Sequence, residues 1–224
     1  MKFLSIKVAR SLWLLHLSDL NPRGKSITRD ALSEIAQRYR FATIPDVKDI
    51  IEARQKNQPF HLLGGVFQSK SGNRIDVAVT VYRDGIVADT TSSTSDGDDF
   101  LTDVFTWLHT DLGLLDHQTL PIRKLYVSEV YVTMEKSLNI INPKLEAFIK
   151  LLQSKLKGSS RKPIYEIGSL AFWIDPEQNP KHTHFRIERA EDIPFHENRY
   201  FSAAPLETDE HLKALELLEE ILTK

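Results

Sequence analysis

The clearest pattern in the chain is a strict alternation of apolar and polar side chains over residues 75–82, and it points to an antiparallel sheet. The apolar positions are Ile75, Val77, Val79 and Val81. A period of two is typical of a half-buried strand. Asp84-Gly85 follows and predicts a hairpin, because both residues tolerate a positive φ. With strands expected at 60–68 and 86–90, residues 60–90 predict a three-stranded antiparallel meander.

Helices are predicted singly between further strands. One begins at Ser95 or Asp96 and ends near Gly113, and the last begins at Thr208. Their apolar faces hold Phe100, Leu101, Val104, Phe105, Leu108 and Leu112 in the first, and Leu212, Leu215, Leu218 and Leu222 in the last. Other helices are expected over 28–40, 45–55 and 142–156. Other strands are expected over 3–17, 125–133, 164–174 and 182–189.

This order of elements determines the predicted fold class. A doubly wound parallel sheet needs sustained alternation of strands and helices, which the sequence lacks. We therefore predict an α+β fold, with an antiparallel or mixed sheet built around the 60–90 meander and helices mainly on one face. No internal repeat is visible in the sequence. Residues 1–224 are expected to form a single compact domain, with residues 1–57 either part of it or a separate N-terminal lobe.

Composition narrows the class of protein further. The chain has 224 residues, of which 41% are hydrophobic and 27% charged, as in ordinary globular proteins. It has no cysteine, which excludes disulfides, thiolate metal sites and a cysteine nucleophile. A formal net charge of −2 nominates neither nucleic acid nor a membrane surface as a partner.

The N-terminal segment does not have the pattern of a signal peptide. Its apolar runs are broken by Lys7, Arg10 and His16, whereas a signal peptide needs an unbroken apolar region of roughly 7–15 residues. No stretch approaches the roughly 20 apolar residues that cross a bilayer. We expect a cytoplasmic protein with no membrane partner.

Familiar catalytic motifs are absent from the sequence. Arg23-Gly24-Lys25-Ser26 resembles the end of a phosphate-binding loop, but that loop needs a glycine where this chain has Asp19. An ordinary turn explains these residues better. Neither G-x-G-x-x-G nor G-x-S-x-G occurs. No cofactor is predicted.

Acidic residues are concentrated between positions 84 and 103, where no basic residue follows Asp84. They are Asp84, Asp89, Asp96, Asp98, Asp99 and Asp103. Carboxylates grouped in this way can hold Mg²⁺ or Ca²⁺. The alternative is that Asp96, Asp98 and Asp99 stabilise the start of a helix, and the others lie in turns.

The predicted strand 182–189 carries a polar face that could bind a metal ion. A period of two places His182, His184, Arg186 and Glu188 on one side. His182 and His184 could share a metal, with Glu188 as a third ligand or a base. With Arg186, the histidines could instead contact phosphate. A solvated strand face gives the same pattern.

A basic segment follows the predicted helix 142–156. Lys155, Lys157, Arg161 and Lys162 surround Gly158-Ser159-Ser160 and are candidates for contact with phosphate or nucleic acid. Within the basic stretch 144–162, no aromatic residue follows Phe148 to stack on bases. A solvated helix end is the alternative.

Three functions are compatible with these features. The first is a non-enzymatic protein-binding or assembly subunit of a bacterial or phage multiprotein system, with a protein partner or self-association. The second is a metal-dependent hydrolase of phosphoester or nucleotide substrates, through His182, His184 and Glu188. The third is a nucleic-acid-binding module. We favour the first, because no catalytic signature accompanies the fold signals.

Overall fold

The computed structural model describes residues 1–24, 28–155, 164–175, 177 and 184–224, with only the backbone of residues 28–30. In this part the chain is an α+β protein with six α-helices and one antiparallel sheet of eight strands. This confirms the predicted α+β fold class with its antiparallel sheet. No helix of the described part is both long and apolar enough to cross a bilayer.

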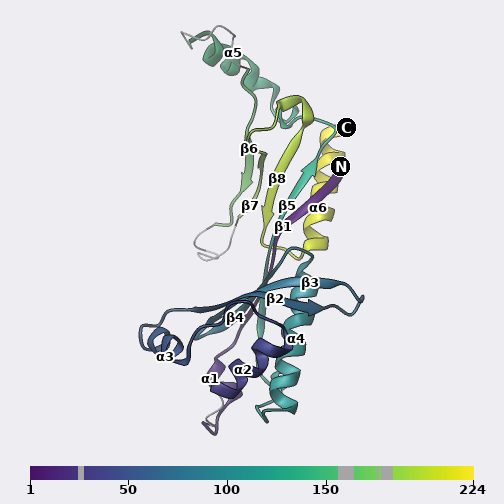
Figure 1. Ribbon diagram of the computed structural model, residues 1–224. Helices are drawn as coiled ribbons and strands as arrows, with labels where there is room; N and C mark the ends of the chain where they lie inside the picture. Colours follow the sequence, from purple (N-terminus) through teal and green to yellow (C-terminus); the bar gives the residue numbers. More distant parts are fainter. Residues whose placement is uncertain (25–27, 156–163, 176, 178–183) are drawn as a thin grey trace. The chain divides into compact units, whose positions relative to one another are not determined.

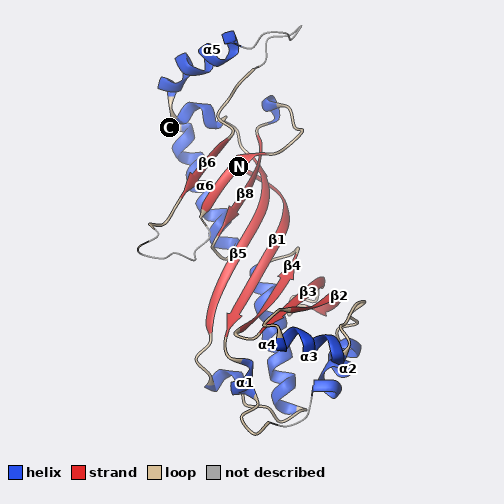
Figure 2. Ribbon diagram, turned by 90° about the vertical axis from the view of Figure 1, so that its left-hand side faces the viewer, coloured by secondary structure: helices blue, strands red, loops and turns tan. Residues whose placement is uncertain are grey.

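The strands of the sheet follow the order β2-β3-β4-β1-β5-β8-β7-β6. The two longest, β1 and β5, are prominent in Figure 2. The strand bounds are β1 Lys2–Leu14, β2 Phe60–Gln68, β3 Arg74–Tyr82, β4 Gly85–Thr90, β5 Arg123–Thr133, β6 Ser169–Phe172, β7 Phe185–Arg189 and β8 Arg199–Ala204.

The helices lie between these strands in the chain, except α6, which follows the last strand (Figure 1). Their bounds are α1 Leu17–Leu20, α2 Thr28–Arg38, α3 Val47–Gln55, α4 Thr94–Thr110, α5 Glu146–Lys155 and α6 Thr208–Thr223. Short 3-10 helices occupy His117–Thr119, Leu138–Ile141, Pro143–Leu145 and Phe195–Glu197.

The order of elements occurs twice along the chain. A long strand, a helical insertion, a three-stranded meander and a long helix follow one another as β1, α1–α3, β2-β3-β4 and α4. The second series is β5, α5, β6-β7-β8 and α6. No internal repeat is visible in the sequence, so this repetition exists at the level of topology. The sequence does not show the repeat because its two halves share element order rather than residues.

The described residues form two compact units. The first consists of Met1–Ser5, Glu129–Ala204 and Asp209–Lys224, and the second of Ile6–Ser128 and Pro205–Thr208. Residues 6–57 therefore belong to the same unit as the β2-β3-β4 meander.

The core of the second unit joins α4 to one face of the meander and of β1. Trp13 stacks on Phe105 with 5.4 Å between ring centroids. The rings of Tyr39 and Phe67 both pack edge-on against the Phe100 ring and are tilted against each other. Ser11 Oγ donates to the Thr94 carbonyl (2.7 Å) and lies against Gly97, so β1 and α4 approach closely.

The hairpin predicted at Asp84-Gly85 is confirmed, but the reason given for it was wrong. Tyr82 pairs with Gly85, which leaves Arg83 and Asp84 as the two-residue turn. Neither Asp84 nor Gly85 has a positive φ. A Cβ atom on Gly85 would lie 2.9 Å from the Trp13 carbonyl oxygen, so glycine permits the close pairing of β4 with β1.

The core of the first unit lies between α6 and the strands β7 and β8, which run side by side in Figure 1. Ser202 of β8 and His211 of α6 are fully buried, with 2.9 Å between Oγ and Nε2. Phe185 and Ile187 of β7 lie on this side, and the Phe185 ring meets His211 edge-on. Leu215 and Leu222 complete the buried side of α6, as predicted.

Several predicted boundaries change. The residue that caps α4 is Ser93, whose Oγ accepts from the Asp96 N–H (3.0 Å), rather than Ser95 or Asp96. The strand expected over 164–174 is limited to β6. The strand β8 was not predicted, because it is short and half of its residues are small side chains that carry little β signal.

Candidate functional site

The edge strand β6 has unpaired backbone groups. The Arg189 N–H donates to the Gly168 carbonyl (2.8 Å), so these two residues form a hydrogen-bonded pair. Hydrogen-bonded pairs alternate with non-hydrogen-bonded pairs along an antiparallel ladder. The backbone N–H and C=O groups of Leu170 and Phe172 therefore also point toward β7. The backbone N–H and C=O groups of Ser169 and Ala171 then point outward. No described residue forms a hydrogen bond with them.

The strand β6 and the residues next to it in the sequence carry no charge. Positions 167–174 read Ile-Gly-Ser-Leu-Ala-Phe-Trp-Ile. Natural edge strands are usually protected from pairing with other chains by shortness, charged residues, proline or a bulge. The strand β6 is short, with four residues, but no charged residue, proline or bulge interrupts it. Its outward backbone groups are therefore without cover from any described residue.

The opposite edge of the sheet, at β2, is protected. Leu63 exchanges backbone hydrogen bonds with Thr43 (3.0 and 3.1 Å). A bulge at Gly64-Gly65 makes this possible, since Gly64 has a φ of +68°. At Gly65 the Phe41 ring lies where a Cβ atom would be. The contrast shows that this chain covers one edge of its sheet with its own backbone, while no described residue covers the other.

Large apolar side chains surround the β6 edge. Phe172 is 55% exposed and Trp173 is 75% exposed. The Trp173 ring stacks on His184, with 4.1 Å between centroids and an interplanar angle of 8°. Ile164 and Ile174 are exposed nearby in the sequence. These side chains could pack against a strand that pairs with β6.

The helix α5 exposes a second apolar surface in the same unit. Phe148, Leu151 and Leu152 have the i, i+3, i+4 spacing of one helix face, and all three are exposed. No residue of α5 is buried among the described residues. Both views show α5 standing apart from the strands and from α6 of its own unit (Figures 1 and 2). An apolar helix face without cover is typical of a surface that binds a partner.

A network around Arg189 holds the segment that leads into β6. Its guanidinium binds the Glu166 carboxylate and the Ser137 hydroxyl (2.9 Å). It also lies over the rings of Phe195 and Tyr200, at 4.5 and 5.2 Å from the centroids. The side chain of Arg189 is only 9% exposed. The approach to β6 is therefore anchored to the core of the first unit.

The polar face predicted on β7 is only partly described. Arg186 and Glu188 share one side of the strand, where their charged groups lie 4.0 Å apart. Arg186 also lies over the Phe201 ring. His184 stacks on Trp173, and His182 lies outside the described residues. Across the part of the chain that is described, no three His, Asp or Glu side chains are grouped as metal ligands. The metal site at His182, His184 and Glu188 stays a prediction.

The basic segment is described at one residue. Lys155 is the last residue of α5 and is exposed, whereas Lys157, Arg161 and Lys162 lie outside the described residues. Contact of this segment with phosphate or nucleic acid also stays a prediction.

The acidic residues of 84–103 are distributed among different partners in the second unit. Asp89 binds Arg10 through two hydrogen bonds (2.7 and 2.8 Å), and Asp99 binds Lys70. Asp103 accepts from Tyr39 Oη (2.7 Å). The helix start thus accounts for Asp96, which bonds to the cap Ser93, but not for the other acids of α4.

Asp98 has the largest set of these partners. It accepts hydrogen bonds from Trp13 Nε1 (2.8 Å), Lys124 Nζ (2.8 Å) and Tyr126 Oη (2.9 Å). Burial, and then the hydrogen bond to Asp98, raise the pKa of Tyr126 well above its ordinary value. The Lys124 ammonium also lies 4.3 Å from the centroid of the Trp13 ring. These contacts join α4, β1 and β5 within the second unit.

Comparison with known proteins adds little to this geometry. No family model matches the chain, and no curated protein matches it. Among solved structures, a TBP of Methanococcus jannaschii matches with a TM-score of 0.39 and 16% identity over 99% of this chain and 97% of that chain. A likeness at this level carries no argument about this protein.

The sequence interpretation did not single out the β6 edge. It treated 164–174 as an ordinary strand, although a run of uncharged residues was already visible in the sequence. Only the strand order shows that this run lies at the end of the sheet.

Proposed function

We propose that this chain is a protein-binding or assembly subunit, and that the outward edge of β6 is its interface. The observation that carries the proposal is the uncharged edge strand, with outward backbone groups at Ser169 and Ala171. A strand from another protein molecule can add to such an edge through main-chain hydrogen bonds, while adjacent side chains give specificity.

The exposed apolar side chains agree with this function. Phe172 and Trp173 flank the end of the strand, and the Phe148 face of α5 belongs to the same unit. Aromatic residues are enriched in protein interfaces because they bury large areas at a small cost in side-chain entropy. The partner is another protein chain, either a second copy of this one or a different protein.

The experiment compares two substitutions at Ala171. Ala171→Pro removes an N–H that points away from β7, so the ladder within the sheet is preserved. Ala171→Val keeps that N–H and serves as the matched control. The mass in solution is measured by light scattering during size-exclusion chromatography, and proteins that co-purify from the native host are identified by mass spectrometry.

We expect the complex formed by this chain, with itself or with a different protein, to depend on the Ala171 N–H. If a second copy is the partner, the wild type and Ala171→Val exceed the 25.7 kDa of one chain, and Ala171→Pro does not. If a different protein is the partner, it co-purifies with the first two and is lost from the third. A monomeric wild type whose co-purifying proteins are the same for all three variants would contradict the proposal.

The other two functions rest in part on residues that lie outside the described part of the chain. The hydrolase needs His182 in addition to His184 and Glu188, and the nucleic-acid-binding module needs Lys157, Arg161 and Lys162 in addition to Lys155. Both stay predictions, and no contact in the described residues favours either over assembly.

A further inference from the structure

The second unit contains a cavity of about 560 Å³ between α1, α2, α3, α4 and the meander. Its walls are mainly apolar and come from elements far apart in the sequence. They include Leu32, Ile35, Ile50, Leu62, Val104 and Leu108. Cavities that bind small molecules in proteins are typically about 300–1,000 Å³, with apolar walls and a few placed polar groups.

The polar residues of this cavity are cationic or neutral. Arg54 lies on α3, Arg83 lies in the turn between β3 and β4, and His16 precedes α1. The side-chain amides of Asn57 and Gln58 accompany them. No aspartate or glutamate is among the described residues that line it. This sign bias stands out in a chain with 31 acidic and 29 basic residues.

Three described carboxylates near the cavity lie outside its lining. Glu52, two residues before Arg54, pairs with Lys48 and Lys56. Asp19 and Asp84 line a separate hollow of about 340 Å³, which shares His16 with the cavity. No described residue forms an ion pair with Arg54 or Arg83. Among the described residues, no carboxylate competes with a ligand for these two guanidinium groups.

We propose that this cavity binds a small amphiphilic molecule with an apolar body and an anionic head group, either a carboxylate or a phosphate. The apolar walls receive the body, whose transfer out of water favours binding. Arg54 and Arg83 bind the head through charge-assisted hydrogen bonds, which are stronger than neutral ones. This site goes beyond the assembly function and does not depend on it, since β6 and α5 belong to the other unit.

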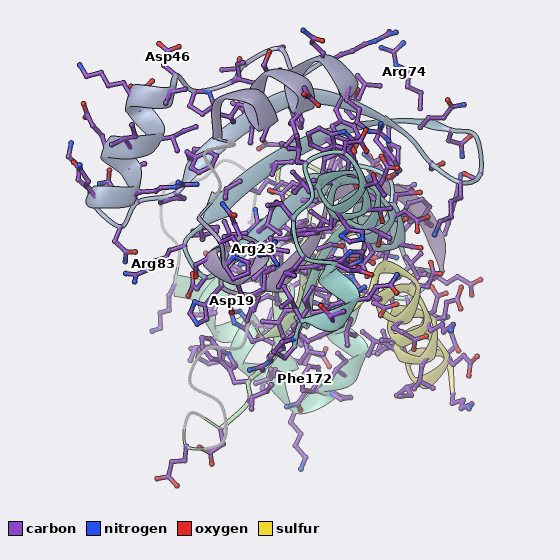
Figure 3. All side chains as sticks on the ribbon, turned by 90° about the horizontal axis from the view of Figure 1, so that it is seen from below. Asp19, Arg23, Asp46, Arg74, Arg83 and Phe172 are labelled. Atoms are coloured by element: carbon purple, nitrogen blue, oxygen red, sulfur yellow. The ribbon has the colours of Figure 1, made fainter. Side chains whose placement is uncertain are left out.

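The test uses dansylaminoundecanoic acid as a fluorescent probe, and its carboxamide as a neutral probe of the same shape. Binding to the full chain is followed by the increase and blue shift of dansyl emission. Three variants change one arginine each: Arg54→Gln, Arg83→Gln and the control Arg74→Gln. Arg74 and Arg83 lie at opposite ends of β3 and are well separated in Figure 3. The control therefore makes the same substitution at an arginine that does not line the cavity.

We expect the carboxylate probe to bind the wild type and Arg74→Gln equally, and to bind Arg54→Gln and Arg83→Gln about tenfold more weakly. The carboxamide should bind weakly to all four proteins. Ala31→Phe and Leu108→Phe place a ring in the cavity and should abolish probe binding, with circular dichroism confirming that each variant is folded. Displacement by dodecanoate or by dodecyl phosphate distinguishes the two head groups.

Three results would overturn the inference. The first is a wild type that does not bind the probe. The second is binding that both cavity-filling variants retain, which would place the probe elsewhere. The third is equal binding by Arg83→Gln, Arg54→Gln and Arg74→Gln, which would show that no anionic group is recognised.

Discussion

His117 is a titratable residue enclosed by aromatic rings. Its ring centroid lies 5.7 Å from those of Trp13 and Phe105. Burial lowers the pKa of His117, and the positive charges of Lys124 and His109 lower it further. Asp116, with Oδ1 3.4 Å from Nδ1, acts in the opposite direction but does not outweigh burial. The neutral imidazole is therefore the form that the fold prefers.

This preference predicts a pH dependence of stability. Between the lowered pKa of His117 and its ordinary value of 6.5, the unfolded chain binds more protons than the folded chain. The free energy of unfolding should therefore fall as the pH drops below 6.5, and His117→Phe should reduce this fall. Urea unfolding at about pH 7.5 and about pH 5.5 measures the difference.

The control for this prediction is His196→Phe at an exposed position. It should leave the pH dependence as in the wild type. An equal loss of stability on acidification in the wild type and His117→Phe would mean that other groups dominate.

At the scale of elements, a reciprocal contact within the second unit joins Thr94 and Thr208. The Thr94 N–H donates to Thr208 Oγ1 (3.1 Å), and the Thr208 N–H donates to Thr94 Oγ1 (3.0 Å). Both residues are buried and each is the first residue of its helix, α4 or α6. Each hydroxyl thus accepts from the N–H of the other threonine. That N–H lies in the first turn of a helix, where the helix itself offers no acceptor.

Thr208→Val is predicted to destabilise the protein by about 1–2 kcal/mol, because the shape is kept but the Thr94 N–H loses its buried acceptor. Thr208→Ser retains the hydroxyl and should cost less. The free energy of unfolding in urea gives both values. A loss for Val that is smaller than the loss for Ser would indicate that the methyl group, rather than the hydrogen bond, stabilises this contact.

The whole molecule is divided unevenly along the chain. The first unit needs three separate segments, including residues 209–224, whereas almost all of the second is continuous. The buried residues His211, Leu215 and Leu222 of α6 belong to the first unit. The large core cluster of the second unit contains none of them.

Removal of residues 209–224 should therefore unfold the first unit and spare the second. Hydrogen exchange followed by mass spectrometry is the measurement. Peptides covering β7 and β8 should lose their protection, while peptides covering β3 and β4 should keep it. Loss of protection in both sets would show that the two units unfold together.

Local pattern alone was enough to predict much of this protein. The alternation over 75–82 predicted β3, and the apolar spacing of 100–108 predicted the buried face of α4. These signals depend on residues that are neighbours in the chain, where the backbone period determines which side chains share a face. The sequence likewise predicted α6 and strands in the regions of β6 and β7.

Tertiary structure decided the rest, because it depends on residues far apart in the chain. The uncharged run at β6 becomes an interface candidate only because strand order places it at an edge of the sheet. Asp98 finds Trp13, Lys124 and Tyr126 on strands distant in sequence. The cavity exists only where four helices meet the meander. No local period encodes such contacts, so only the folded chain brings these groups together.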